Sequence, residues 1–174
     1  MTPNQQNPDM DQDKPNNALA SPEALAQVAE FHHTFQHPVE PEPCIPAPER
    51  CRLRINLIAE ELRELETAID HSDIVEVADA LCDIQYVLAG AVLEFGLGSH
   101  FKALFEEIQR SNMSKSCASR EEAEATQAYY RSERGFDSYI REVDGHWLVF
   151  REGDHKTLKS VNYSPPDLAR ILAR

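Results

Sequence analysis

The sequence predicts a mainly α-helical protein with one small β-hairpin near its C-terminus. Apolar side chains recur every three or four positions over several stretches between residues 25 and 108, which is the spacing of one face of an α-helix. Further along, the β-rich runs SYIREV and HWLVFRE flank Asp144-Gly145, a dipeptide typical of a tight two-residue turn. The chain has 174 residues, which is enough for one well-packed domain.

The N-terminal segment, residues 1–20, is rich in Asn, Gln, Asp and Pro and nearly free of large apolar side chains. Such a segment buries too little surface to offset the entropy lost on ordering, so we expect a disordered tail. Ser21-Pro22 then predicts a helix start, with Ser21 as N-cap, and Pro38 ends that helix. The prolines of the next stretch, PVEPEPCIPAPE, predict an extended strap.

Two long helices are expected next, over about 49–70 and 73–95, joined by a short turn and ended near Gly96 or Gly98. Between residues 74 and 93 nearly every side chain of the second helix is apolar, so this helix is expected to be covered on most sides. The apolar stripe of the first helix consists of Ile55, Ile58, Leu62, Leu65 and Ile69.

The remaining elements follow from local signals. A helix over 99–112 is expected to point four apolar side chains inward, namely Phe101, Leu104, Phe105 and Ile108. Ser119 and Glu122 form a capping box that opens a further helix, which Gly135 closes. Ser164-Pro165 is expected to cap a last short helix. We therefore divide the chain into a tail (1–20), a helical bundle (21–118) and a C-terminal part with a helix, the hairpin and the closing helix (119–174).

Charge and composition exclude several classes of function. The formal net charge is −13, which argues against binding to nucleic acid or to an anionic membrane. No apolar run is long enough for a membrane span. The four cysteines show no Cys-x-x-Cys spacing, and we expect reduced thiols of a cytoplasmic protein.

Six carboxylates interrupt the two long helices. Three lie within an arc of about 100° beside the apolar stripe of the first helix, and three lie within about 60° on the second. They are Glu60, Glu61 and Glu64, followed by Glu76, Asp79 and Asp83. Because a short turn joins the helices, the two acidic stripes are expected to face each other. Facing carboxylates repel unless cations or protons intervene, so the sequence predicts a Mg²⁺ or Mn²⁺ site.

Three alternatives to a magnesium or manganese site involve the same acids. A row of acids at helical spacing is also typical of a solvated helix face, and for the EELRELE segment this alternative stays open. A zinc site is disfavoured because no Cys or His shares the acidic arc of the helices. A ferritin-like di-iron site is disfavoured because neither of the two long acidic helices carries the Glu-x-x-His pair of that bundle.

The segment EELRE followed by EVADALCDIQYV resembles the signature of the all-α nucleoside triphosphate pyrophosphohydrolases, which include MazG-like proteins and phosphoribosyl-ATP pyrophosphohydrolase. The resemblance continues in SNMSK (111–115) and in KTLKSVNYSPPDLARIL (156–172). It implies a helical bundle completed by dimerisation, as a homodimer or a dimer of dimers. It also implies Mg²⁺-dependent hydrolysis of a nucleoside triphosphate between the α and β phosphates, with dUTP or a noncanonical nucleotide as candidate substrates.

The resemblance also implies residue roles. Glu60 is the expected general base, and the expected metal ligands are Glu61, Glu64, Asp79 and Asp83, with Glu76 as a third or outer ligand on the second helix. Glu76 and Asp79 match the second half of the signature literally. On the register set by Tyr86, however, Asp83 takes the Asp position and Ala80 the Glu position, so two choices of metal pair stay open.

Substrate contacts are expected from five residues: Tyr86, Asn112, Lys115, Lys156 and Lys159. For Asn112 the alternative is a helix C-cap, and for the lysines an exposed surface position. Two alternatives to an enzyme remain: a non-catalytic, nucleotide- or partner-binding regulator of the same fold, and a structural bundle with a solvated acidic ridge.

Three further residues carry expectations. His32 lies on the apolar stripe of the first helix, which favours a packed side chain over a metal ligand. Gly90, on the acidic edge of the second long helix, predicts a close approach by another chain or a ligand. Trp147 is expected to anchor the hairpin to the bundle rather than to stack on a base.

Overall fold

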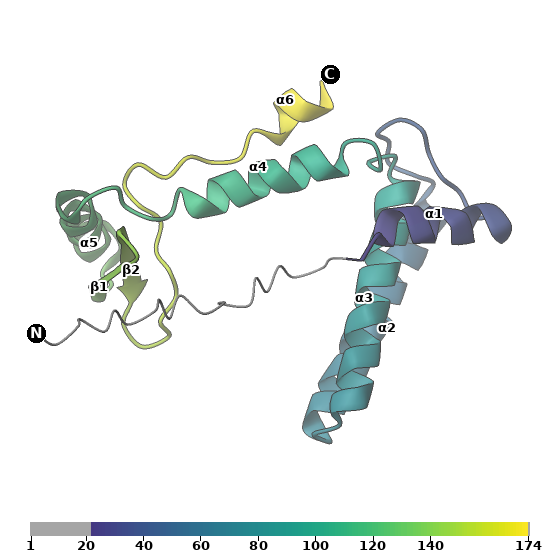
Figure 1. Ribbon diagram of the computed structural model, residues 1–174, viewed down its shortest axis with the longest axis horizontal. Coiled ribbons are helices and arrows are strands. Elements are labelled where there is room, and N and C mark those ends of the chain that lie inside the picture. Colours follow the sequence, from purple (N-terminus) through teal and green to yellow (C-terminus); the bar gives the residue numbers. More distant parts are fainter. Residues whose placement is uncertain (1–21, 174) are drawn as a thin grey trace, which may run out of the picture.

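The computed structural model describes residues 22–173 and confirms the mainly α class with a two-stranded antiparallel hairpin (Figure 1). The elements in order are α1 (Ala24–Thr34), α2 (Pro48–Asp70), α3 (Ile74–Glu94), α4 (Phe101–Met113), α5 (Arg120–Arg134), β1 (Ser138–Val143), β2 (His146–Arg151) and α6 (Leu168–Leu172). The predicted tail and the predicted cap at Ser21 lie outside the described residues.

The two long helices form a hairpin, with α2 and α3 side by side and α1 crossing α3 near one end (Figure 1). Their bounds agree with the prediction to within one residue. The turn between them is set by Ser72, which has a positive φ of 56°, and by Asp73. The Asp73 carboxylate caps α3 by accepting hydrogen bonds from the backbone N–H groups of Val75 (3.0 Å) and Glu76 (3.3 Å).

A buried ionic network ties α1, α2 and α3 together. The Glu94 carboxylate, only 1% exposed, accepts hydrogen bonds from Arg50 and Arg54 of α2. Arg54 also lies 3.1 Å from His32 Nε2, while His32 Nδ1 lies 2.8 Å from the carbonyl oxygen of Pro38. A carbonyl can only accept, so Nδ1 carries the proton and Nε2 accepts from Arg54. The predicted packed role of His32 is therefore confirmed.

This network shifts the protonation of its members. Burial lowers the pKa of His32, and the neighbouring Arg54 charge adds to the effect. Burial alone would raise the pKa of Glu94, but the hydrogen bonds from Arg54 and Arg50 outweigh it and hold that pKa below its ordinary value. The folded state thus contains an ionised Glu94 and a neutral His32.

The proline-rich strap forms neither helix nor strand, as its sequence predicts, and it runs back along the end of α3. The backbone N–H of Glu40 donates to the carbonyl of Leu93, and that of Cys44 donates to the carbonyl of Phe95. Gly96 makes this crossing possible because it has a positive φ of 67° and because a Cβ there would lie 1.8 Å from the Glu42 carbonyl oxygen.

The prediction for the inward face of α4 is wrong for Phe105, which is 64% exposed. α4 buries Leu104, as predicted, together with the polar side chains of Glu107 and Ser111. The reason is that α4 packs on the C-terminal segment around α6, where the Glu107 carboxylate accepts a hydrogen bond from the backbone N–H of Asp167 (2.9 Å). This bond and those from Arg110 lower the pKa of Glu107 to about 2.

The predicted cap of the last helix is also wrong. Ser164 is not the N-cap of α6, because the carboxylate of Asp167 fills that role by accepting from the Arg170 backbone N–H at 3.1 Å. Ser164 instead accepts a hydrogen bond from Arg110 of α4 at 3.0 Å. The helix consequently begins after Asp167 rather than directly after the Ser-Pro pair.

Residues 115–163 form a C-terminal module in which α5 packs against the hairpin. The predicted capping at Ser119 and the left-handed Gly135 at the end of α5 are confirmed, as is the turn at Asp144-Gly145. Trp147 packs on a small core made by Cys117, Ala123, Val149 and Leu158. It therefore anchors the hairpin within this module and not to the α1–α3 bundle.

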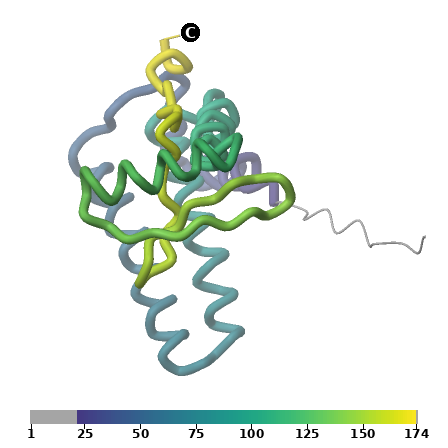
Figure 2. The backbone as a smooth tube through the Cα atoms, turned by 90° about the vertical axis from the view of Figure 1, so that its left-hand side faces the viewer, coloured from purple at the N-terminus to yellow at the C-terminus, as the bar shows by residue number. Residues whose placement is uncertain are grey.

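The C-terminal module and the α2–α3 hairpin lie at opposite ends of α4 (Figures 1 and 2). The single chain does not cover α3 on most sides, so the expectation that this helix is covered stays a prediction for the dimer. Large apolar side chains of both long helices are exposed, among them Ile55, Leu62, Ile69, Ile74, Val75, Leu81 and Leu88. Within residues 22–173, no helix is both long enough and apolar enough to cross a membrane.

Candidate active site

The acidic stripes of α2 and α3 meet around Glu61. Its Oε2 atom is buried and has no hydrogen-bond partner within residues 22–173. Burial raises the pKa of Glu61, and the negative charge of Asp83 raises it further. Glu64, Glu60 and Asp79 add smaller contributions of the same sign. An acid of α2 therefore lies within electrostatic reach of two acids of α3.

The helix periodicity explains this arrangement. Asp79 and Asp83 are four residues apart, so they share one face of α3, and both are exposed in the single chain. Ala80 is only 3% exposed. One register of the signature has Glu at the position of Ala80. Ala80 lies on the packed side of α3, whereas the neighbouring Asp79 is exposed.

Glu64 and Glu76 lie together closer to the turn of the hairpin. They line a small cavity of about 270 Å³ with Thr67, Ala68, His71 and Asp73. Glu76 is therefore grouped with Glu64, whereas Asp79 and Asp83 are grouped with Glu61. The two metal pairs that the sequence leaves open both stay predictions.

The carboxylates approach one another without forming a finished metal cage. Over residues 22–173, no three Asp, Glu, His or Cys side chains lie close enough together to hold a metal ion between them. The buried and unpaired Oε2 of Glu61 fits a hard divalent cation, since such ions prefer carboxylate oxygen.

The expected base and one expected substrate contact lie beside this cluster. Glu60 is exposed and adjoins Glu61 on α2. Tyr86, three residues beyond Asp83 on α3, is 39% exposed, and its ring packs edge-on against Phe31 of α1 at a centroid distance of 5.6 Å. Both positions are open to a ligand, and the roles assigned to them stay predictions.

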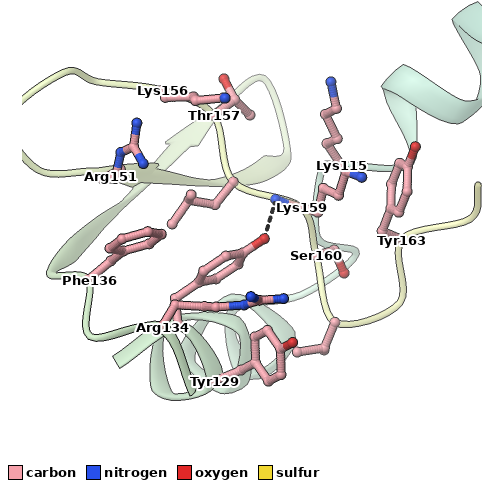
Figure 3. A pocket seen from close by; sticks show the side chains of 13 residues that line it. Lys115, Tyr129, Arg134, Phe136, Arg151, Lys156, Thr157, Lys159, Ser160 and Tyr163 are labelled. Carbon is pink, nitrogen blue, oxygen red and sulfur yellow. Dashed lines mark hydrogen bonds between the residues drawn. The ribbon is translucent and has the colours of Figure 1, made fainter. Parts of the chain in front are cut away.

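The lysines expected to bind phosphate gather elsewhere. Lys115, Lys156 and Lys159 line a cavity of about 830 Å³ in the C-terminal module (Figure 3). None of the residues lining this cavity belongs to α2 or α3. Asn112 is exposed at the end of α4, where its Oδ1 accepts a hydrogen bond from Lys115 Nζ at 2.8 Å. In one chain, these residues are brought together with each other but not with the acids.

Sequence reasoning missed two arginines of the same cavity, Arg134 and Arg151. A signal for Arg134 existed, because it follows Tyr130 by four residues on α5 and so shares its helix face. No comparable signal existed for Arg151, because the tail that encloses it is irregular. Arg50 and Arg54, which as cations of α2 could have contacted phosphate, are instead engaged by Glu94.

Comparison with known proteins agrees with the acidic signature. The family model for phosphoribosyl-ATP pyrophosphohydrolase matches residues 28–112. That family is a member of the all-α nucleoside triphosphate pyrophosphohydrolase superfamily, to which this segment is similar. The matched residues include most of α1, all of α2 and α3, and all of α4 except its last residue, Met113. The C-terminal module lies beyond the matched segment.

The chain is also similar to the uncharacterized protein L479 of Acanthamoeba polyphaga mimivirus. It is 34% identical over 92 residues, which cover 51% of this chain and 37% of the viral protein. The chain thus spans well under half of the length of that relative. The family is one of nucleotide pyrophosphohydrolases, that is, hydrolases acting on acid anhydrides.

Proposed function

We propose that the chain is a Mg²⁺-dependent hydrolase that cleaves a nucleoside triphosphate between the α and β phosphates. Water adds across the P–O–P bridge, and the products are a nucleoside monophosphate and pyrophosphate. The observation that carries the proposal is Glu61 Oε2, which is buried and unpaired next to four other carboxylates. A buried polar atom without a partner costs free energy, and a divalent cation would offset that cost while binding the triphosphate.

The residues have distinct roles in this proposal. Glu61, Asp79 and Asp83 would hold the metal, and Glu64 and Glu76, which lie closer to the turn of the hairpin, would be the further acids available to it. When bound, the metal would neutralise phosphate charge and lower the pKa of a coordinated water. Glu60 accepts the proton of the attacking water, for which its exposed position beside Glu61 is suitable. Tyr86 orients the nucleotide from the open edge of α3.

The apolar surface of the long helices supports a dimer. Seven large apolar side chains of α2 and α3 are at least 40% exposed in the single chain. Spaced seven residues apart, Ile55, Leu62 and Ile69 share one face of α2, and Ile74, Leu81 and Leu88 share one face of α3; apolar faces of this kind are typical of an interface between protein chains. We propose that a second copy covers this face, giving a four-helix core from two α2–α3 hairpins, as a homodimer or a dimer of dimers.

The proposal extends to a substrate and a cellular location. A deoxynucleotide such as dUTP, or a noncanonical nucleotide, is the proposed substrate. The cysteines Cys44, Cys51, Cys82 and Cys117 are all free thiols. This is the state of thiols in the cytoplasm, where we propose that the protein acts.

One observation favours a second candidate function, a regulator that binds nucleotide without hydrolysing it. The acids do not converge on a common point anywhere in the described part of the chain, 22–173. A regulator would bind a nucleotide in the presence of Mg²⁺ but release no pyrophosphate.

The test is pyrophosphate release from a panel of ribo- and deoxynucleoside triphosphates, with and without Mg²⁺. We expect release only with Mg²⁺, and we expect the double variant E61A/D83A to lose it while its circular dichroism spectrum stays unchanged. The control E66A removes an exposed acid of α2 outside the cluster and should hydrolyse like the parent chain. Turnover retained by E61A/D83A would refute the site. Nucleotide binding without pyrophosphate release would favour the regulator.

A further inference from the structure

A cavity in the C-terminal module concentrates positive charge. It has a volume of about 830 Å³ and lies between α5, the end of β2 and the tail that follows (Figure 3). Five cationic side chains line it, and no Asp or Glu does: Lys115, Arg134, Arg151, Lys156 and Lys159. This is unexpected in a chain with a formal net charge of −13. Gathered cations repel one another unless an anion joins them, so the cavity is suited to a multiply charged anion.

Several of these cations are free to bind a ligand. Within residues 22–173, no carboxylate lies within 4 Å of the side-chain nitrogens of Arg134, Lys156 or Lys159. Arg151 is held in place by Asp154 and lies over the ring of Phe136 at 5.0 Å. The side of the cavity with Arg151 is therefore fixed, while three cations retain unused hydrogen-bond donors.

Aromatic rings form the rest of the lining. Tyr130 and Phe136 have nearly parallel rings, 15° apart, with centroids separated by 6.4 Å. Tyr129 is 41% exposed and stands beside Tyr130. Tyr163 lies across the cavity, with its ring centroid 4.3 Å from Lys159 Nζ. Flat aromatic faces next to cations are the surfaces on which proteins stack the base of a nucleotide and hold its phosphates.

The cavity is built into the fold of the module. The tail that forms one wall is held by the backbone N–H of Lys159, which donates to the Tyr130 hydroxyl at 3.2 Å (Figure 3). Further along, the backbone N–H of Val161 donates to Thr126 Oγ1 at 3.1 Å. Leu158, 5% exposed, ties the same tail to the core. A cavity whose walls are held in this way needs little reorganisation to bind a ligand.

We propose that this cavity binds a nucleoside phosphate without a divalent metal. Lys156, Lys159 and Arg134 contact the phosphates, and Tyr129 at the rim stacks on the base. Two sources supply this chemistry: the substrate of the acidic site of a second copy of the chain, or a separate nucleotide that regulates the protein. The inference stands on the cavity alone and is independent of hydrolysis at the acidic cluster.

The experiment is isothermal titration calorimetry of the full chain with dUTP in EDTA, where metal-dependent hydrolysis does not occur. We expect one dUTP per chain, with inorganic triphosphate weaker and deoxyuridine weaker still. R134E should weaken dUTP binding at least tenfold. The matched control R131E makes the same charge change on α5 at a residue that does not line the cavity, and it should bind dUTP like the parent chain. Y129A should weaken dUTP but not inorganic triphosphate.

Two results would overturn the proposal: no saturable binding of dUTP or triphosphate in EDTA, or equal affinities of R134E and R131E. Because the titration contains no metal, its failure is separate from a failure of the hydrolysis assay. The source is distinguished by mixing inactive E61A/D83A chains with R134E chains. If the mixture releases pyrophosphate faster than either variant alone, the cavity of one copy serves the acids of another. If the mixture releases pyrophosphate no faster than the R134E chains alone, while the E61A/D83A chains still bind dUTP, the cavity is a separate nucleotide site.

Discussion

The guanidinium of Arg54 lies directly against the backbone of Gly90. A Cβ built on Gly90 would be 2.6 Å from Arg54 Nη1. It would also be 3.1 Å from His32 Nε2. Glycine inside a helix costs about 1 kcal/mol relative to alanine. That cost is accepted here because only a residue without a side chain lets Arg54 pass across α3 to reach Glu94.

The first prediction is that G90A destabilises the protein by about 1–3 kcal/mol, the usual effect of overpacking a buried site. The added methyl group must displace the guanidinium of Arg54. Hydrogen bonds to Glu94 and His32 hold this guanidinium in place, so it cannot move away easily. The control is G98A, where the added Cβ meets only the flexible end of Leu93 at 3.3 Å. Urea unfolding of both variants measures the difference, and a G90A chain as stable as G98A would contradict the packing described.

The second prediction concerns the buried carboxylate itself. E94A leaves the charge of Arg54 buried without its partner, and removing one member of a buried ion pair costs about 3–5 kcal/mol. The matched control E106A removes an acid of α4 whose side chain is 67% exposed and whose ion pair with Lys102 is long, at 3.9 Å. We expect E106A to change the free energy of unfolding very little. Equal effects of E94A and E106A would show that the network does not stabilise the fold.

The third prediction is a loss of stability on acidification in two ranges of pH. The pKa of His32 is lowered from 6.5, so the unfolded chain binds this proton more readily, and stability falls as pH drops below 6.5. The pKa of Glu94 is lowered from 4.5, so its contribution is complete above 4.5 and is lost as pH falls through the folded value.

Urea unfolding between pH 2 and pH 8 measures both ranges. An H32Q variant, which keeps a hydrogen-bond donor but cannot titrate, should lose the dependence that begins at pH 6.5 and keep the one that begins at 4.5. If H32Q followed the parent curve throughout, the neutral, buried state of His32 would be wrong.

Much of the fold could be predicted because the decisive signals are local. The ends of α5 are set by Ser119 and Gly135, and the β-turn by Asp144-Gly145, all within a few residues of the structure they specify. Helical periodicity likewise identifies which residues share a face. It does not identify what covers that face. Periodicity predicts an inward Phe105, but α4 packs on the α6 segment and leaves this side chain exposed.

The two candidate sites differ in the same way. The acidic cluster could be predicted because its members lie on two consecutive helices joined by a short turn, so sequence spacing almost determines their proximity. The basic cavity draws Lys115, Arg134 and Lys159 from three separated segments. Their meeting depends on how the tail folds back over α5, and no periodicity in the sequence describes that path.

The fourth prediction tests the metal site by stability alone. Replacing Glu61 by Gln removes one charge from a group of mutually repelling carboxylates, so E61Q without metal should melt a few degrees above the parent chain. Addition of Mg²⁺ should raise the melting temperature of the parent chain but not that of E61Q. E66Q, altered at an exposed acid outside the cluster, should respond to Mg²⁺ like the parent. A Mg²⁺ response that survives in E61Q would place the ion elsewhere.

The last prediction concerns the exposed apolar face of α2 and α3. Leu81 is 52% exposed in the single chain, and a glutamate there would be buried without a partner in the proposed dimer. L81E should therefore sediment as a monomer at concentrations where the parent chain is a dimer. The control V143E introduces the same charge at a residue of β1 that is 47% exposed and distant in the fold from the long helices. Since V143E keeps the face intact, it should remain dimeric in the ultracentrifuge. A parent chain that sediments as a monomer, or an L81E chain that remains a dimer, would exclude this face as the interface.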